Sequence, residues 1–156
     1  SIEAQLSPRA TAGGGGLSAG VAAAVKALSP GTTVVTVEPE GAPKLAKSKA
    51  AGTRVTLERT DSIADGLITL SVGELNWAHL SRFVDRADTV ADGAMREAVR
   101  FALDRLKLVV EPSGAATLAW LLSRPKGAVK GPVVAVLSGG NVEWEGLRAL
   151  LEGPSR

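Results

Sequence analysis

A run of four glycines, Gly13–Gly16, is the first segment of the chain with the residue types to bind a ligand, and it stands directly before an Ala-rich segment, 17–28. Glycine has no Cβ, so backbone N–H groups in such a run can approach a ligand closely. A helix N-terminus adds partial positive charge. The run therefore predicts a site for an anion such as a phosphate. A flexible linker is the alternative, although linkers are usually diluted with serine.

A second candidate segment, Ser138-Gly139-Gly140-Asn141, follows the apolar run 133–137 far along the chain. It would place a hydroxyl at the end of a strand, where the adjacent glycines let a ligand come close. Taken alone, these residues favour a plain turn. Only a link to the glycine run would make them part of a ligand site.

The elements that must position these two segments alternate between helix and strand. Apolar periodicity and Gly/Pro punctuation predict helices over 17–28, 43–51, 74–84, 94–107, 115–123 and 143–152. Short β-branched or apolar runs predict strands over 33–37, 54–57, 87–90 and 133–137, the last being the clearest buried strand. This alternation is typical of an α/β fold with a mostly parallel sheet. Ligands of such sheets bind beyond the carboxyl ends of the strands, where both glycine segments fall.

Composition excludes several classes of function. The chain has 156 residues, the length of one domain, and its net charge of +2 is too small for binding that rests on neutralising a phosphate backbone. The absence of cysteine excludes disulfides and thiolate chemistry, and the single histidine, His79, excludes histidine-rich metal sites. No apolar run approaches the roughly 20 residues of a membrane span, and no secretory signal opens the sequence. We expect a cytoplasmic protein without a nucleic-acid or membrane partner.

Five segments in a fixed order carry a family resemblance. They are GGGGL (13–17), VEPEGA (37–42), SIADGL (62–67), KLVVEPSGAA (107–116) and VLSGGNV (136–142). Together they resemble the second half of the serine/threonine dehydratase family, which includes threonine ammonia-lyase and serine racemase and uses pyridoxal phosphate on fold type II. The resemblance implies a three-layer αβα large-domain portion over 13–156, with residues 1–12 as an upstream remnant or terminus.

The resemblance also implies which residues hold the cofactor. Its phosphate would be bound by backbone N–H groups of the glycine run and the next residue, namely Gly13, Gly14, Gly15, Gly16 and Leu17. Ser138, with Gly139 beside it, would hydrogen-bond the pyridine nitrogen, and a neutral hydroxyl there makes a weaker electron sink than a carboxylate, which suits β-elimination. Gly66 and Glu111 would line the cofactor's surroundings. For Glu111, capping of the following helix is the alternative.

A divalent cation is a further possibility raised by the resemblance, with Glu38 and the carbonyl of Ala42 as ligands. The sequence departs here, because Lys44 stands where cation-binding members tend to have an acid, and an ammonium repels a cation and has no lone pair to donate. The pocket would then bind a cation, be empty, or be filled by that ammonium. Lys44 also belongs to a basic cluster that favours a solvated helix face over an anion contact: Lys44, Lys47, Lys49 and Arg54.

No catalytic residue is predicted within the chain. The family attaches its cofactor to a lysine in a Ser-x-Lys-x-Arg type motif in the first half, and the chain has no such segment; Ser48-Lys49-Ala50 lies where the family has a surface helix. Residues 9–12 do not make a convincing strand before the glycine run. An incomplete sheet of this kind exposes an unpaired edge, which predicts a homo-oligomer or association with a missing N-terminal half.

The function expected from the resemblance is a pyridoxal-phosphate ammonia-lyase that converts L-threonine or L-serine into a 2-oxo acid and ammonia. Within the family, serine racemase is the alternative activity. A non-catalytic truncated or split module that binds an anion or a partner subunit is the alternative outside it.

Overall fold

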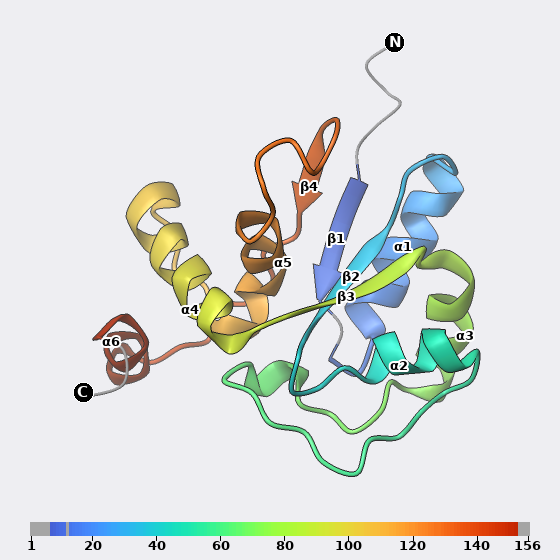
Figure 1. The fold of residues 1–156 in the computed structure, drawn as a ribbon, viewed down its shortest axis with the longest axis horizontal. Coiled ribbons are helices and arrows are strands. Elements are labelled where there is room, and N and C mark those ends of the chain that lie inside the picture. Colours follow the sequence, from blue (N-terminus) through green and yellow to red (C-terminus); the bar gives the residue numbers. More distant parts are fainter. Residues whose placement is uncertain (1–6, 12, 153–156) are drawn as a thin grey trace.

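Four strands form one parallel sheet at the centre of the structure, a computed structural model that describes residues 7–11 and 13–152 (Figure 1). The order in the sheet is β3-β2-β1-β4. The strands are β1 (Ser7–Thr11), β2 (Val35–Pro39), β3 (Arg86–Val90) and β4 (Val133–Ala135). All three strand pairs are parallel, which confirms the predicted sheet.

Strand β2 is buried along its whole length, as its continuous β-branched sequence predicts for a strand covered on both faces. It starts two residues later than expected because the N–H of Val34 donates to the Asp85 carboxylate at 2.7 Å instead of joining the ladder. It also runs two residues further, since Glu38 and Pro39 pair with Thr89 and Val90 of β3.

The expectation that no convincing strand precedes the glycine run is wrong. β1 lies there, paired with β2 on one side and with β4 on the other. The sequence of β1 does not predict a strand inside the sheet, because it contains Pro8, and proline has no N–H to donate to a neighbouring strand. The sheet therefore includes residues 7–11, upstream of the division expected at residue 13. The rest of that segment, 1–6 and 12, lies outside the described residues, as does 153–156.

The strand predicted over 133–137 is shorter and more exposed than expected. β4 covers three residues at the edge of the sheet, and Val134 is 40% exposed. An edge strand has a neighbour on one side only, so an apolar run need not be fully buried there. The strand predicted over 54–57 is also wrong, because these residues are irregular.

Helices cover both faces of the sheet and complete the three-layer αβα arrangement (Figure 1). On one face α1 (Gly16–Leu28) packs against α3 (Glu74–Phe83), and on the other α5 (Pro112–Leu122) packs against the strands and α4 (Asp92–Phe101) packs against α5. The short helix α2 (Lys44–Ala51) lies beside β3, and α6 (Trp144–Glu152) packs on α4. The described part of the chain also contains the 3-10 turn η2 (Asp65–Leu67) and a π-helical turn, η3 (Ala102–Leu106).

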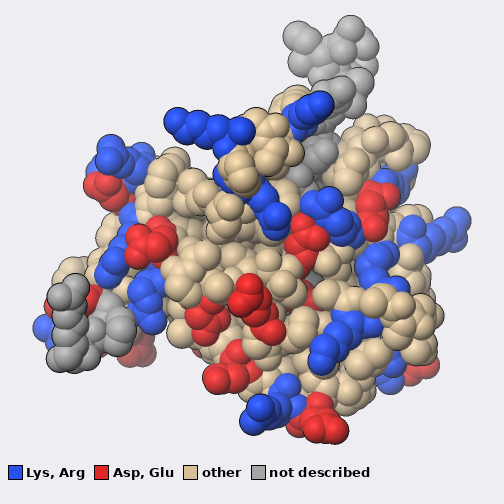
Figure 2. Space-filling model, in the orientation of Figure 1, with Lys and Arg blue, Asp and Glu red and all other residues tan. Residues whose placement is uncertain are grey.

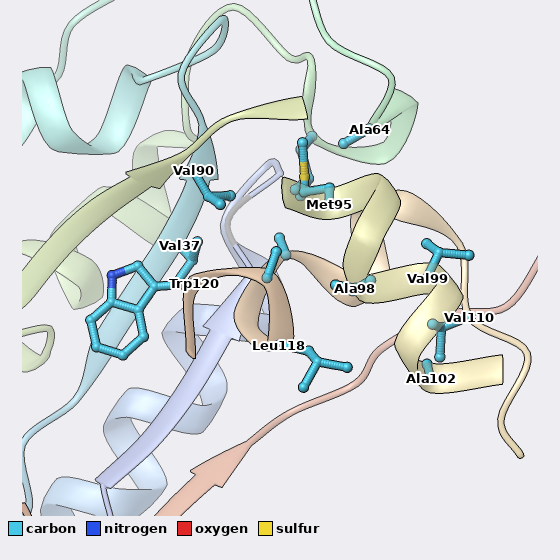
Figure 3. Packing of buried hydrophobic residues seen from close by; sticks show 14 of the residues in the cluster. Val37, Ala64, Val90, Met95, Ala98, Val99, Ala102, Val110, Leu118 and Trp120 are labelled. Carbon is cyan, nitrogen blue, oxygen red and sulfur yellow. The ribbon is translucent and has the colours of Figure 1, made fainter. Parts of the chain in front are cut away.

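The larger hydrophobic core lies between the sheet and the α4–α5 layer (Figure 3). Met95 and Val99 of α4 are buried there with the small residues of α5, whose helix is buried from Pro112 to Trp120. Trp120 extends this layer to the sheet edge, where its Nε1–H donates to Asp88 Oδ2 on β3 at 2.7 Å. A smaller core, which includes Leu45 and Leu80, lies on the opposite side.

The surface carries charges of both signs. Figure 2 shows Lys and Arg side chains spread around the visible face, with several acidic side chains gathered near its lower centre. No helix in the described part of the chain has the length and apolar character to cross a bilayer.

Two glycines allow a direct test of the fold. A Cβ on Gly41 would overlap the backbone carbonyl oxygen of Asp61, whereas a Cβ on Gly20 in α1 would meet no atom within 4 Å. We expect Gly41→Ala to lower the free energy of unfolding by about 2 kcal/mol because backbone must move. Gly20→Ala should raise it by about 0.5–1 kcal/mol, since alanine favours a helix. Urea denaturation measures both, and equal midpoints for the two variants would contradict the packing at Gly41.

Candidate functional site

The glycine run forms a bend that enters α1. Gly15 has a φ of +93°, in the left-handed region that glycine adopts readily, and it is the N-cap residue of α1. A Cβ on Gly15 would lie 2.8 Å from Cδ1 of Leu80 in α3. Both the backbone conformation and the neighbouring helix therefore require glycine at this position.

Helix α3 fixes the orientation of the bend. The carbonyl oxygen of Gly14 accepts hydrogen bonds from the N–H of Gly73, at 2.9 Å, and from Nδ2 of Asn76, at 2.7 Å. A trans peptide directs its N–H opposite to its C=O, so the next N–H, that of Gly15, points away from α3. The bend is thus held by its carbonyl side and leaves its N–H side for other partners.

The bend offers an anion the free end of a helix. The first N–H groups of an α-helix have no acceptor within the helix, and Gly15 has no side chain to supply one. The first turn of α1 contains no acidic residue, and Gly14, Gly16 and Leu17 are exposed. This combination of backbone donors and positive partial charge suits a phosphate.

The turn η2 lies against the glycine bend. A Cβ on Gly13 would overlap the carbonyl oxygen of Gly66, so the two backbones meet directly. The N–H of Gly66 donates to Oγ of Ser113, at the start of α5, at 3.0 Å. Gly66 therefore connects the glycine bend to α5.

The loop after β4 lies against the same end of α5. A Cβ on Gly114 would lie 2.6 Å from the carbonyl oxygens of both Ser138 and Gly139. The N–H of Glu111 donates to the carbonyl of Gly139 at 3.2 Å, and the Glu111 carboxylate accepts from the N–H of Asn141 at 3.1 Å. The loop thus adjoins the start of α5 directly, whereas the glycine bend is connected to it through Gly66.

Four segments that are far apart in sequence form one continuous group in this way: the glycine bend, η2, the start of α5 and the loop after β4. The structure brings together Gly13, Gly66, Glu111, Ser138 and Gly139 through the contacts just described. Their roles toward a cofactor remain predictions. The alternative of a plain linker at Gly13–Gly16 is wrong, because α3 and η2 hold the run in place.

Glu111 does not cap α5 with its side chain. It stands at the N-cap position, yet its carboxylate makes no capping hydrogen bond and instead bonds the N–H of Asn141. The capping alternative for this residue is therefore wrong. Its acid orders the loop after β4, which carries Ser138.

Two residues that hold the site were missed by the sequence analysis. Asn76 bonds the carbonyl of Gly14, and Ser113 bonds the N–H of Gly66. A signal existed for Asn76, since it shares the inward helical spacing of Leu80 and Phe83, where a polar residue is unusual. Nothing in the local pattern singles out Ser113.

The pocket next to Glu38 is filled by an ammonium. Glu38 and Lys44 are both fully buried, with Nζ of Lys44 3.4 Å from Oε1 of Glu38 and 2.8 Å from the carbonyl oxygen of Leu67. Burial raises the pKa of Glu38 and lowers the pKa of Lys44, and in each case the charge of the other group opposes the shift. Ala42, the other residue predicted at this pocket, is buried, and its carbonyl accepts the backbone N–H of Lys44 at 3.0 Å.

The solvated-face interpretation of the basic cluster is therefore wrong for Lys44. Lys47 and Arg54 are exposed as expected, and Lys49 donates to the carbonyl of Val84. In the described ranges, no three His, Cys, Asp or Glu side chains gather as a metal ligand set would.

Comparisons with known proteins show which family the chain resembles. The family model of pyridoxal-phosphate dependent enzymes matches residues 7–139. Serine racemase of Oryza sativa subsp. indica is 41% identical over 143 residues, which cover 86% of this chain and 42% of that protein. L-threo-3-hydroxyaspartate ammonia-lyase of Saccharomyces cerevisiae is 36% identical over 141 residues, covering 90% of this chain and 43% of that protein.

A solved structure extends the likeness to the fold. The crystal structure of the T.th. threonine deaminase is 44% identical with a TM-score of 0.84, covering 88% of this chain and 50% of that one. The chain thus spans less than half the length of the two curated relatives. It is a member of the pyridoxal-phosphate dependent enzyme family, in the group of serine/threonine dehydratases, racemases and ammonia-lyases that share fold type II.

Proposed function

We propose that this chain supplies the phosphate cradle and the pyridine partner of a pyridoxal-phosphate lyase that releases a 2-oxo acid and ammonia from L-serine or L-threonine. One observation carries the proposal: the glycine bend, η2, the start of α5 and the loop of Ser138 form one continuous group. The relatives' names cover a racemase, an ammonia-lyase and a deaminase, so the family membership does not select one substrate.

The residues of the bend fit the cofactor's phosphate. A Cβ on Gly14 would meet no protein atom within 4 Å, so the space beside this residue is open. The glycines place no side chain there, and the N-terminus of α1 contributes N–H donors. A dianionic group would therefore be bound by backbone N–H groups of the bend.

Ser138 is the proposed partner of the pyridine nitrogen. When bound, pyridoxal phosphate supplies an electron sink for the substrate's α-carbon. The hydroxyl of Ser138 would hold the ring nitrogen by a hydrogen bond without adding a charge, and Glu111 would keep the Ser138 loop in register with α5. Such a neutral partner makes the ring a weaker electron sink than a carboxylate would, which suits β-elimination.

The lysine that attaches the cofactor and the groups that bind the substrate carboxylate would come from another part of the protein. Serine racemisation is the second candidate activity, favoured by the 41% identity to the rice enzyme. A non-catalytic anion-binding module is the third, and it differs from the others in needing no such lysine.

Cofactor binding tests the cradle. We expect the purified protein to bind pyridoxal phosphate more tightly than pyridoxal, because only the former has the dianion. Gly14→Ala should raise the Kd for pyridoxal phosphate about tenfold, since a methyl group enters the space that the phosphate needs. Its melting temperature should be unchanged, because the methyl group meets no protein atom. Gly20→Ala, a substitution in α1 outside the bend, is the control, and equal affinities of the two variants would refute the cradle.

Turnover tests the reaction. Together with the part of the protein that carries the cofactor-binding lysine, the chain should release pyruvate from L-serine or 2-oxobutanoate from L-threonine, as followed by a coupled reductase assay. Chiral chromatography for D-serine identifies the racemase alternative. We expect Ser138→Ala to lower kcat about tenfold through loss of one hydrogen bond to the ring. Absence of both cofactor absorbance and 2-oxo acid would reject the proposal, and a stoichiometric borohydride-stable adduct on the chain alone would reject the non-catalytic module.

A further inference from the structure

A buried ion pair joins two segments next to the site. Glu38 is on β2 and Lys44 is the first residue of α2, and neither side chain reaches solvent. The Lys44 ammonium also donates to the carbonyl of Leu67, the last residue of η2. The lysine thus connects the β2–α2 segment to the turn that touches the glycine bend.

Helix α2 engages the Glu38 carboxylate as well. Both of its oxygens accept the N–H of Leu45, at 3.0 and 2.9 Å, and Oε2 also accepts the N–H of Ala46 at 2.9 Å. These donors belong to the first turn of the helix, where a negative charge is favourable. The carboxylate is therefore satisfied by protein groups and has its counter-charge beside it.

A divalent cation does not fit this pocket. It would have to displace the Lys44 ammonium, which contacts both the Glu38 carboxylate, a predicted cation ligand, and the Leu67 carbonyl. Displacement would leave a buried ammonium without its partners, and an uncompensated buried charge is strongly destabilising. The Glu38 carboxylate and the Leu67 carbonyl are already bound by the Lys44 ammonium.

We propose that Lys44 is a built-in cation: its ammonium takes the place of a divalent metal ion beside Glu38, and through Leu67 it positions η2 against the glycine bend. The second half of this statement rests on the proposed function. The path is short, since Lys44 holds the carbonyl of Leu67, Gly66 precedes Leu67, and the carbonyl of Gly66 meets Gly13. Ser113 also holds this turn, because its Oγ accepts the N–H of Gly66. Lys44 is accordingly a positioning residue, which acts on the glycine bend through η2.

The first experiment tests the built-in cation on the unmodified protein. Its melting temperature is measured after treatment with EDTA and again with millimolar Mg²⁺, Ca²⁺ or Mn²⁺. We expect all values to agree within about 1 °C, because a cation that binds only the folded state would raise the melting temperature. A rise with any of these cations that is lost in Glu38→Gln would overturn the proposal.

The second experiment tests positioning with a matched pair of lysines on α2. Lys44→Met removes the buried charge, and Lys47→Met removes an exposed charge from the same helix. We expect Lys44→Met to lower the melting temperature by about 10 °C and to raise the Kd for pyridoxal phosphate about tenfold. Lys47→Met should change neither. A Lys44→Met protein with a lowered melting temperature but the original Kd would show a structural role only and would overturn the positioning.

Two further arms keep the outcomes distinct. If Lys44→Met does not fold, Lys44→Gln gives the same comparison of Kd with melting temperature while retaining a donor for Leu67. If the unmodified protein binds no pyridoxal phosphate, the proposed function fails, and the metal titration still decides whether Lys44 is the built-in cation.

Discussion

The site depends on the close approach of backbone to backbone at a few glycines. Gly13 meets the carbonyl of Gly66, and Gly114 meets the carbonyls of Ser138 and Gly139. Each contact leaves no room for a Cβ, so a side chain at either glycine would separate segments that the site needs together. The parallel sheet makes these contacts possible, because the carboxyl ends of β1 and β4 lie at the same end of the sheet. The loop after β4 reaches the start of α5 directly, and the glycine bend after β1 reaches it through Gly66.

The helices and the order of the elements could be predicted from the sequence because their signals are local. Periodicity and Gly/Pro punctuation place α1, α2, α3 and α6 within about two residues. β1 could not be predicted, since its pairing with β2 and β4 makes it a strand while Pro8 argues against one. The exposure of β4 was missed for a related reason: an apolar run does not reveal which strand lies at the edge of the sheet.

The sequence predicts the segments that form the candidate site but not the hydrogen bonds that join them. The order of the five segments indicated the family, but Asn76 and Ser113 act through hydrogen bonds to the backbone of distant glycines. The basic cluster favours a solvated face for Lys44, because Lys47 and Lys49 resemble a charged helix surface, whereas the family resemblance raised the ammonium-filled pocket that the structure shows. Lys44 is buried because it contacts Glu38 and Leu67. The end of β2 separates it from Glu38 in the sequence, and an irregular segment separates it from Leu67. No periodic pattern therefore predicts its burial.

The N-termini of α1 and α2 both present N–H donors and partial positive charge, but only the N-terminus of α2 is neutralised by a side chain of the protein. At α2 the first N–H groups bond the Glu38 carboxylate, and the Lys44 ammonium balances that charge, so this end is closed to any external anion. At α1 the cap is a glycine, the first turn has no acid, and the preceding carbonyl is turned toward α3. An internal acid near the bend would compete with a bound phosphate for the same donors. The buried pair therefore closes α2 to an external anion, and the same pair holds η2 beside the glycine bend, where the anion site is proposed.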